Sequence, residues 1–482
     1  MTRNIATTAF NWLVAIAFLT ASVTNISIHS ESFGAYLAIY PPVILIAALL
    51  PSAYSIVKQT RWFDQFAIAF FGFTLFSSII NPNSKTATYL SLYAFAIIFM
   101  AIVLRNAVAL FGWRDFLQKS NVVGCISLSL VAIVEFFSRR MFGINPFGWL
   151  PFVNPPLAVC GFDVPRSYAL SVEPTYLAWY LSTLGTVAIW YVWQLRVAYT
   201  LKLACAFAVT LALITTWSTS AMVSIPAAAS LTLIYVAIFD KQKIVRWWSR
   251  AAAFFTSCAI IFVALCVILF ATISSSSLEP CLNYVGMKPV AQALYGDRDI
   301  VKQIKKQHDI LVARRMTAVS SGDTSELARI DAALAATNNS LAQLADHAHV
   351  ENSLSRFQIW KRDLAKAIER PWFGWGPGYN SAQGNSSSLN FFIAVFLENG
   401  ALALMSLVLF LLFVALHIAR SAAPSKYMFL FAYAAGCLHM LTQTRFFFPY
   451  VWLLMGLFWL EDAAINSVSL ADLSNRKSED RR

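Results

Sequence analysis

The sequence predicts an all-α polytopic membrane protein with about 12 transmembrane helices and one long helical loop, on three observations. The 482 residues are 58% hydrophobic and only 12% charged, whereas about a quarter of the residues in a soluble domain are charged. Apolar windows of about 20 residues, the length that spans a bilayer as a helix, recur along most of the chain. A single long polar stretch, residues 274–389, interrupts them. The apolar surface is too large for a water-soluble core, so we expect the bilayer to be the solvent.

The apolar windows define the expected spans in chain order. The first is too long, and has the wrong flanks, for a cleaved signal peptide, so we interpret it as a retained helix. Three further windows follow the long polar stretch. The windows cover residues 6–28, 34–56, 62–80, 88–104, 121–137, 174–193, 201–217, 219–239, 251–273, 396–417, 427–443 and 446–460.

The basic residues in the short loops predict the orientation. Cytoplasmic loops carry an excess of lysine and arginine. With the N-terminus inside, eighteen such residues fall in inner segments and five in short outer segments, namely Lys85, Arg139, Arg140, Arg166 and Arg445. Both termini are therefore expected in the cytoplasm and residues 274–389 outside it. The net charge of +12 is explained by these loops, and no motif points to a nucleic-acid partner.

Four segments follow from this topology. Residues 1–273 hold spans one to nine and an outer loop at 138–173, and residues 274–389 form the long outer loop. Residues 390–460 hold the last three spans, and residues 461–482 form a cytoplasmic tail.

The long outer loop is itself expected to be helical. Leucine and isoleucine at heptad-like spacing predict a helical hairpin over about residues 301–344. Its expected role is structural. A third helix, about residues 353–369, ends before Pro371, which cannot continue a helix.

Two of the seven cysteines, Cys160 and Cys281, fall in outer loops. An oxidising compartment permits a disulfide between them. Sequence spacing does not show that their Cα atoms approach to bonding distance, so two free thiols remain the alternative.

Five charged residues are expected at the outer membrane face: Arg166, Glu173, Arg356, Glu398 and Arg445. A charged side chain inside a bilayer costs about 2.5–3.5 kcal/mol on insertion scales, so it needs a partner or a cavity. Three guanidinium groups and two carboxylates at one interface suit an anionic, lipid-linked phosphate substrate. The alternative is that each side chain reaches the headgroups and only sets the topology.

A glycine-rich and aromatic segment follows the third loop helix. Arg356 and Trp360 share a helix face, and residues 371–379 read Pro-Trp-Phe-Gly-Trp-Gly-Pro-Gly-Tyr. The segment lacks the Gly-Lys-Ser/Thr ending of a phosphate-binding loop. Its aromatic side chains suit either a belt at the membrane interface or stacking against sugars. They are Trp372, Phe373, Trp375 and Tyr379.

In this arrangement the chain resembles the O-antigen ligase and polymerase family of bacterial envelope glycosyltransferases. Members of that family have many spans, an arginine followed by a Glu-Pro-like motif before one span, and a long outer loop that ends in a series of short motifs. The detailed match covers about 60 residues. The matching elements are Arg166 with Glu173 and Pro174, then Arg356, Trp360, Pro371, Gly374, Gly376, Asn390, Glu398 and Gly400.

The resemblance implies a GT-C-like fold in the bacterial inner membrane, a periplasmic position for the long loop, and a metal-independent reaction without a cofactor. The donor would be a glycan on undecaprenyl diphosphate, and the acceptor another lipid-linked repeat. Arg356 and Arg166 would hold the diphosphate, and Glu173 or Glu398 would orient or deprotonate the acceptor hydroxyl. A chain-length regulator and a flippase are the other partners considered. The candidate substrate-binding residues are Trp360, Trp372, Trp375, Tyr379, Asn390, Arg445 and His439.

One departure from the family bears on the reaction. Ligases, which transfer a finished glycan to lipid A core, typically carry a histidine directly before the asparagine of the last motif. This chain has Leu389 there. The missing imidazole favours a polymerase over a ligase.

Other classes find less support. His308, His347 and His349 lack partners at zinc-site spacing, so no metal is expected. His439 suits a base or a hydrogen-bond donor, with simple packing as the alternative. No Gly-x-Ser-x-Gly motif indicates a hydrolase. A transporter remains the main rival, although its usual internal repeats and midplane charges are missing from the pattern, and a non-catalytic envelope scaffold is a third class.

Overall fold

The structure of the protein is a computed structural model. The structure describes residues 2–23, 60–148, 157–159, 162–164, 166–171, 173–239, 311–312, 330–331, 334, 349–385, 388–443 and 449–463. The chain divides into two compact units, and each is treated by itself. The first comprises residues 1–154, 166–262 and 359–482, and the second comprises residues 155–165 and 263–358.

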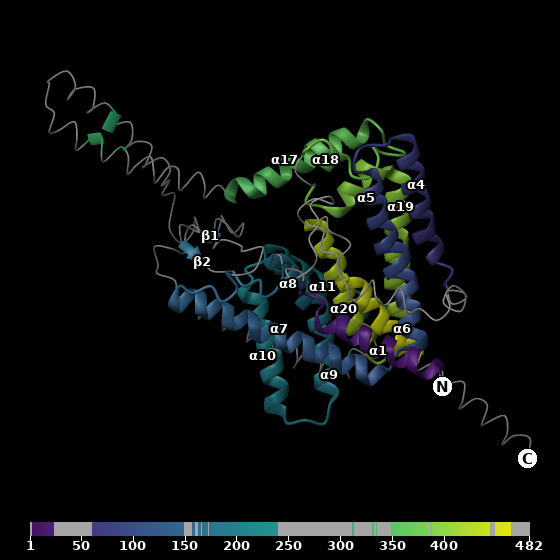
Figure 1. Ribbon diagram of the computed structural model, residues 1–482, viewed down its shortest axis with the longest axis vertical. Helices are drawn as coiled ribbons and strands as arrows, with labels where there is room; N and C mark the ends of the chain where they lie inside the picture. Colours follow the sequence, from purple (N-terminus) through teal and green to yellow (C-terminus); the bar gives the residue numbers. More distant parts are fainter. Residues whose placement is uncertain are drawn as a thin grey trace, which may run out of the picture. The chain divides into compact units, whose positions relative to one another are not determined.

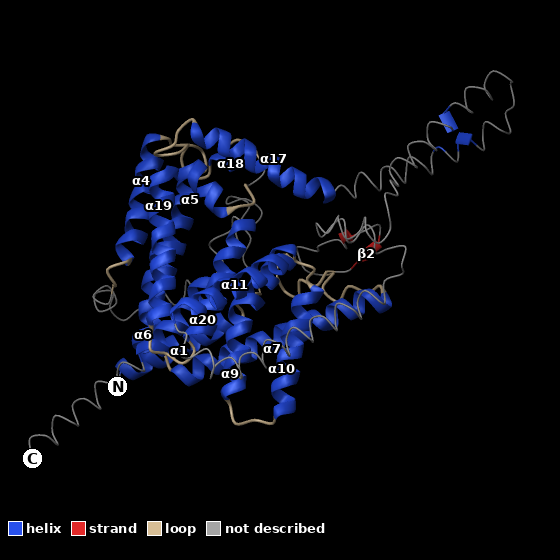
Figure 2. Ribbon diagram, turned by 180° about the vertical axis from the view of Figure 1, so that it is seen from behind, coloured by secondary structure: helices blue, strands red, loops and turns tan. Residues whose placement is uncertain are grey.

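The described part of the chain is helical, which confirms the predicted class, with one short antiparallel hairpin as the exception (Figures 1 and 2). The elements are α1 (Thr2–Leu19), α4 (Asp64–Ile80), α5 (Thr86–Tyr93), η2 (Ala94–Leu104), α6 (Arg105–Phe111), α7 (Arg114–Phe142), β1 (Leu157–Val159), β2 (Phe162–Val164), α8 (Pro174–Tyr180), η3 (Leu181–Gly185), α9 (Thr186–Gln194), α10 (Tyr199–Thr215), α11 (Thr219–Phe239), α17 (His349–Ile368), α18 (Tyr379–Ala382), α19 (Phe391–Arg420), α20 (Lys426–His439), η4 (Met440–Thr442) and a last helix at residues 450–463.

Membrane association rests on the apolar helices. Within the described residues, four helices are long and apolar enough to cross a membrane, at Thr86–Phe111, Arg114–Phe142, Ser220–Phe239 and Phe391–Arg420. Each overlaps a predicted window, because the same sustained apolar runs define the windows and the helices. The count of about 12 spans is not confirmed, and the windows at 34–56 and 251–273 lie outside the described residues.

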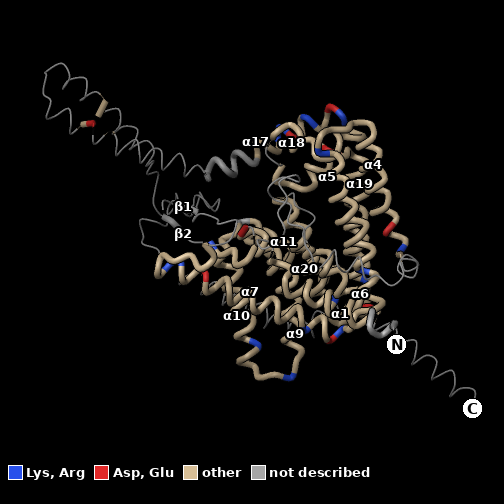
Figure 3. The backbone as a smooth tube through the Cα atoms, in the orientation of Figure 1, with Lys and Arg blue, Asp and Glu red and all other residues tan. Residues whose placement is uncertain are grey.

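Helices α4 and α19 pack side by side in opposite directions (Figure 1). At the start of α4, the Trp62 ring lies 4.6 Å from that of Phe413, near the end of α19. At the end of α4, the Ser77 hydroxyl donates to the carbonyl oxygen of Glu398, near the start of α19. The helix pair therefore has one end at Trp62 and Phe413 and the other at Ser77 and Glu398. Charged residues gather at these ends rather than between them (Figure 3).

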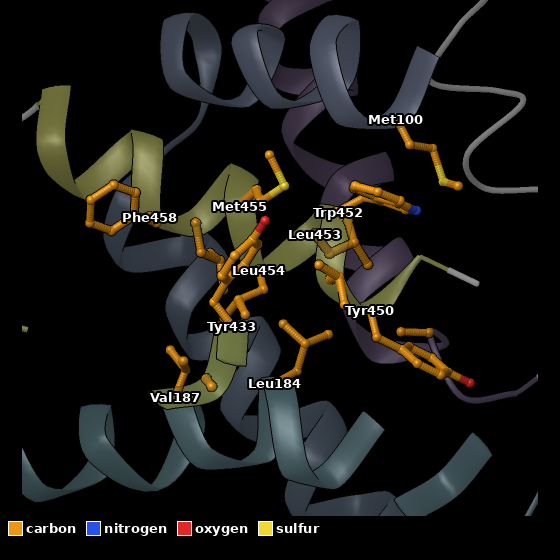
Figure 4. Close-up of a cluster of buried hydrophobic side chains, with 14 of the residues drawn as sticks. Met100, Leu184, Val187, Tyr433, Tyr450, Trp452, Leu453, Leu454, Met455 and Phe458 are labelled. Atoms are coloured by element: carbon orange, nitrogen blue, oxygen red, sulfur yellow. The ribbon is translucent and has the colours of Figure 1, made fainter. Parts of the chain in front are cut away.

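The core of the first unit is built around the last helix. Every residue from Tyr450 to Asp462 is buried, as expected for a helix enclosed on all sides. Trp452 and Phe458 of this helix belong to one buried cluster with Tyr433 of α20 and Leu184 of η3 (Figure 4), and the Phe458 ring lies 5.4 Å from that of Phe429 on α20. The helices expected as the last two spans and the sixth thus share one core.

The end of this helix differs from the sequence prediction. Glu461 and Asp462, expected in a cytoplasmic tail, are buried within the helix. The Ser425 hydroxyl donates to Glu461 at 2.6 Å, and the Ser421 hydroxyl donates to Asp462 at 2.6 Å. Arg114 pairs with Glu461 at 3.4 Å. These contacts tie together α7, α19, α20 and the last helix.

The second unit is described only in part. It contains the β1–β2 hairpin, in which Ala158 pairs with Asp163. The helical hairpin expected over residues 301–344 lies outside the described residues apart from short pieces, as do Cys160 and Cys281. The third loop helix is confirmed as α17, which ends before Pro371.

Candidate functional site

Helix α19 is broken at Gly400. This residue has φ 81° and ψ −179°, inside an otherwise helical segment, and that conformation is open in practice only to glycine. A Cβ at this position would lie 2.2 Å from the carbonyl oxygen of Trp372. The helix therefore depends on glycine at this point, and the residues before Gly400 form a separate half-helix.

The glycine-rich loop 371–379 satisfies the backbone groups that the break releases. The N–H of Trp375 donates to the carbonyl oxygen of Leu397 at 2.9 Å, and that of Gly376 donates to the carbonyl oxygen of Glu398 at 2.8 Å. The N–H of Ala401 donates to the carbonyl oxygen of Pro371 at 2.7 Å. Because unpaired backbone groups are costly in an apolar environment, the loop and the break stabilise each other.

A second glycine, Gly374, is required because the loop backbone lies close to the backbone of α19. Gly374 has φ 65°, and a Cβ there would lie 2.5 Å from the backbone of Glu398. The loop is also held by the end of α4, where the Asn81 amide donates to the Gly374 carbonyl oxygen at 3.0 Å and the Ser77 hydroxyl donates to the Phe373 carbonyl oxygen at 2.5 Å. Two motifs 24 residues apart in the sequence, Gly374 and Glu398, thus form one structural unit.

The Glu398 carboxylate is buried in this unit, with 5% of the residue exposed. The Tyr93 hydroxyl donates to its Oε2 at 3.2 Å, and the backbone amide of Gly378 and the Asp363 carboxylate are its other electrostatic neighbours. Among the described residues it forms no salt bridge. The neighbouring Asn399 amide is fully buried and has no hydrogen bond of good geometry, although it lies beside Tyr93.

The second carboxylate in this region is compensated. Asp363, on α17, pairs with Arg362 at 2.7 Å. Its Oδ2 accepts from the Asn380 amide at 3.2 Å, and the same amide lies 3.2 Å from the Ser388 hydroxyl. Glu398 differs from Asp363 in lacking such a cation.

The predicted aromatic residues fall into different environments. The Trp375 ring contacts the Lys366 ammonium at 4.1 Å and the Arg370 guanidinium at 3.9 Å, and its indole N–H donates to the Lys366 carbonyl oxygen at 2.8 Å. The Tyr379 ring lies 5.3 Å from that of Trp375. Trp372, in contrast, is 62% exposed. Trp375 therefore helps to fix the loop, whereas Trp372 is accessible to sugar or lipid.

Trp360 and Asn390 are placed by local structure. Trp360 is half-buried on α17, and its indole N–H has no hydrogen-bond partner among the described residues. The Asn390 side chain accepts from the N–H of Ile393 and so caps α19. Leu389, just before it, has φ 52°, a conformation in which asparagine, aspartate and histidine are enriched.

Arg166 and Glu173 lie at a second place, before α8. The Arg166 Nε donates to the carbonyl oxygen of Thr216 at 3.0 Å, between α10 and α11. Glu173 is half-buried and directly precedes Pro174, the first residue of α8. Proline suits this position because its missing N–H has no partner in a helix start.

This segment is held by Glu135, which was not predicted from the sequence, and by Arg139, which was predicted only as an outer-loop charge. Oε2 of the buried Glu135, on α7, accepts from the N–H groups of Tyr168 and Ala169 at 3.0 and 2.7 Å. Arg139 pairs with Glu135 at 3.1 Å and donates to the carbonyl oxygen of Arg166 at 3.3 Å. A glutamate inside an apolar window was the signal for this network, because such a charge needs a partner.

His439 lies at the end of α20, against α8. Its ring stacks on Trp179 with centroids 5.5 Å apart and an angle of 8° between the planes. The histidine is fully buried beside the backbone of Thr175, and neither ring nitrogen has a hydrogen bond of good geometry among the described residues. The structure thus associates His439 with α8, the helix that directly follows Glu173.

The structure therefore distributes the predicted site residues over two places. Glu398, Trp372, Trp375, Tyr379 and Asn390 belong to the broken helix and its loop, whereas Arg166, Glu173 and His439 surround α8. In Figure 1, α8 lies apart from α18. The side chain of Arg356 and the whole of Arg445 lie outside the described residues, and Arg356 belongs to the second unit. Their expected roles stay predictions.

No metal centre was found in the part of the chain that the structure describes, where no three His, Cys, Asp or Glu side chains group as ligands. The expectation of a reaction without a metal or cofactor is not tested by this.

Comparison with known proteins adds no assignment. No model of a known protein family matches the chain, and no curated protein sequence matches it. The likeness to the O-antigen ligase and polymerase family therefore rests on the motifs and their arrangement, and the function is a matter for proposal.

Proposed function

We propose that this protein is a membrane glycosyltransferase that joins oligosaccharide repeats carried on undecaprenyl diphosphate. The observation that supports it most is the unit formed by Glu398, Gly400 and loop 371–379. The sequence resemblance pairs these motifs, and in the fold they hold each other by backbone hydrogen bonds. A buried carboxylate without a cation stands at their centre.

The chemistry assigned to this unit is transfer of a glycan to a hydroxyl. The acceptor oxygen bonds to the anomeric carbon of the donor, and the bond from that carbon to the diphosphate breaks. The bonding electrons leave with the diphosphate, and the acceptor proton passes to Glu398, with Glu173 at α8 as the alternative base that the resemblance offers. The resemblance, not the described geometry, gives Arg356 and Arg166 the role of stabilising the charge on the leaving diphosphate.

Polymerisation is proposed rather than ligation because residue 389 is leucine. The backbone of Leu389 is left-handed, a conformation that would also suit the histidine that ligases typically carry. The leucine therefore removes the imidazole from a position whose backbone could hold it. Ligation to lipid A core or to a protein is the alternative within the same chemistry.

The direct test supplies purified protein in detergent with lipid-linked repeats and no ion gradient. A polymerase should produce a ladder of longer glycans. Arg356→Lys should reduce this product strongly, because a point charge loses bidentate phosphate geometry. Arg420→Lys, at the exposed end of α19, is the matched control and should retain activity. No ladder from the unmodified protein, or a normal ladder from Arg356→Lys, would count against the proposal.

A transporter is the second candidate, because the break in α19 favours it. Interrupted membrane helices often bind substrates or ions in carriers. Here the freed carbonyl oxygens of Leu397 and Glu398 are occupied by loop N–H groups, which argues for a fixed structural break. Movement of lipid-linked repeats across proteoliposomes without new glycosidic bonds would support the transporter instead.

We also propose the bacterial inner membrane as the location, with both termini in the cytoplasm. The positive-inside bias supports this orientation, as does the placement of Arg114 and Lys426 near one end of the α4–α19 pair and loop 371–379 at the other. A reporter fused after residue 482 should report the cytoplasm, and one inserted after Gly384 the periplasm. The reverse pattern would overturn the orientation.

A further inference from the structure

The part of α17 in the first unit has two different sides. Asp363 and Ala367 are buried against the rest of the unit. Leu364 is 39% exposed and Ile368 is 68% exposed. Because these two residues are four apart, they share one face of the helix. We call Leu364, Ile368 and Trp372 the apolar shoulder.

The apolar shoulder is connected to the lipid-facing surface of α4. The Phe373 ring lies 4.9 Å from that of Phe76, and the Arg370 guanidinium donates to the side-chain oxygen of Asn81, directly after α4. The end of α4 is itself exposed and apolar, with Ile79 69% exposed. In a helix packed beside the membrane-spanning α19, such side chains face lipid.

Most charged residues lie beside the apolar shoulder. The exposed Arg362 and the Lys366–Glu369 pair are on the neighbouring side of α17, whereas the exposed Lys361 precedes Leu364 by three residues and continues the face of the shoulder at its N-terminal end. Helices with an apolar face, a charged face and a tryptophan lie in the plane of a membrane interface, with the apolar face about 5–10 Å below the headgroups. Lysine and arginine stems reach the headgroups from that position.

We propose that residues 359–372 form an in-plane membrane anchor, in which the apolar shoulder contacts lipid acyl chains and Lys361 contacts headgroup phosphates. The occupant of this surface is the bilayer, since the shoulder continues the exposed apolar end of α4. Loop 371–379 is then held at the membrane surface, not above it. A lipid-linked substrate reaches Glu398 from within the outer leaflet. The proposal is independent of the reaction and applies equally to a transporter.

The test measures the depth of individual side chains in vesicles of phosphatidylethanolamine and phosphatidylglycerol. A ketone-reactive spin label on p-acetylphenylalanine is placed at Leu364, Ile368 or Trp372 of the full chain, so that the native cysteines remain. Gln383, exposed in the following loop, is the aqueous control, and Ile79 is the lipid reference. Relaxation by oxygen and by a nickel complex is compared, because oxygen concentrates in lipid and nickel in water.

Labels on the apolar shoulder should give an oxygen-to-nickel ratio severalfold above that at residue 383 and close to that at residue 79. A ratio equal to that at residue 383 would place the helix in water and overturn the proposal. Low access to both reagents would mean that protein covers the surface and would also overturn it. Three label positions are used so that one misfolded variant, recognised by its thermal unfolding, does not decide the result.

Discussion

Two buried carboxylates at opposite ends of the α4–α19 pair have different partners. Asp64, at the start of α4, receives two hydrogen bonds from the Arg105 guanidinium, at 2.8 and 2.6 Å. Arg105 also lies 4.6 Å from the Trp459 ring. Glu398, at the other end, accepts hydrogen bonds from the Tyr93 hydroxyl, at 3.2 Å, and from the backbone N–H of Gly378, and it has no salt bridge among the described residues.

The different partners of Asp64 and Glu398 indicate different roles for the two carboxylates. A buried carboxylate with a bidentate arginine is satisfied, and removing either partner leaves an unpaired charge in an apolar core. A buried carboxylate without a cation is costly to the fold, and in the function proposed above it takes up the acceptor proton. Asp64 is therefore assigned to stability, and Glu398 is proposed to act in the reaction.

The largest effect on stability is expected from Arg105→Met. The change leaves Asp64 buried without its cation, which should lower the free energy of unfolding in detergent by about 3–5 kcal/mol. The double variant Asp64→Leu, Arg105→Met removes both charges and should recover much of this loss. Equal instability of the single and double variants would show that the ion pair is not the cause.

Gly400→Ala should have the next largest effect. The alanine would have to adopt a conformation that costs about 1–3 kcal/mol in strain, in addition to its clash with Trp372. Gly72→Ala on α4 is the control, since nothing lies within 4 Å of its added Cβ, and it should leave thermal unfolding unchanged or slightly improved. If both variants unfold at the same temperature, the break in α19 does not depend on Gly400.

The helices were predictable from the sequence because their signals are local. Pro371 stops α17, and long, mainly apolar runs predict α7 and α19. The break at Gly400 was not predictable, because a single glycine in an apolar window is compatible with a continuous helix. Its conformation depends on loop 371–379, which contacts it only in the folded chain.

The site was predictable in its residue types but not in its arrangement. Glu398 and the loop glycines were named from their motifs, and the fold brings them together. Arg105 is one of the eighteen basic residues predicted in inner segments, and a charge at the edge of an apolar window does not reveal a buried partner 41 residues away in the sequence. Glu135 was missed for the same reason.

Glu135→Ala tests the network beneath Arg166. It removes the acceptor for two backbone N–H groups and the partner of Arg139, and unsatisfied buried groups cost about 1–3 kcal/mol. We expect a loss of this size in unfolding free energy, together with reduced activity as the segment at 166–171 loosens. Glu369→Ala, at an exposed site, should change neither. A Glu135→Ala protein as stable as the unmodified chain would remove the structural role.

Leu389→Asn should have the smallest effect, and in the favourable direction. Asparagine tolerates the left-handed conformation at residue 389 better than leucine does. A gain of up to about 1 kcal/mol is expected, measured as a small rise in the thermal midpoint. A clear fall would mean that the leucine side chain contributes more by packing than its backbone costs.

The most direct test of the comparison is Glu398→Gln, assayed for both stability and glycan elongation, with Glu369→Gln as the exposed control. Glutamine keeps the size of the side chain and an acceptor for Tyr93 but removes the charge. The assignment of Glu398 to the reaction predicts unchanged or improved thermal stability and loss of most elongation activity. Normal elongation by a folded Glu398→Gln protein would contradict it.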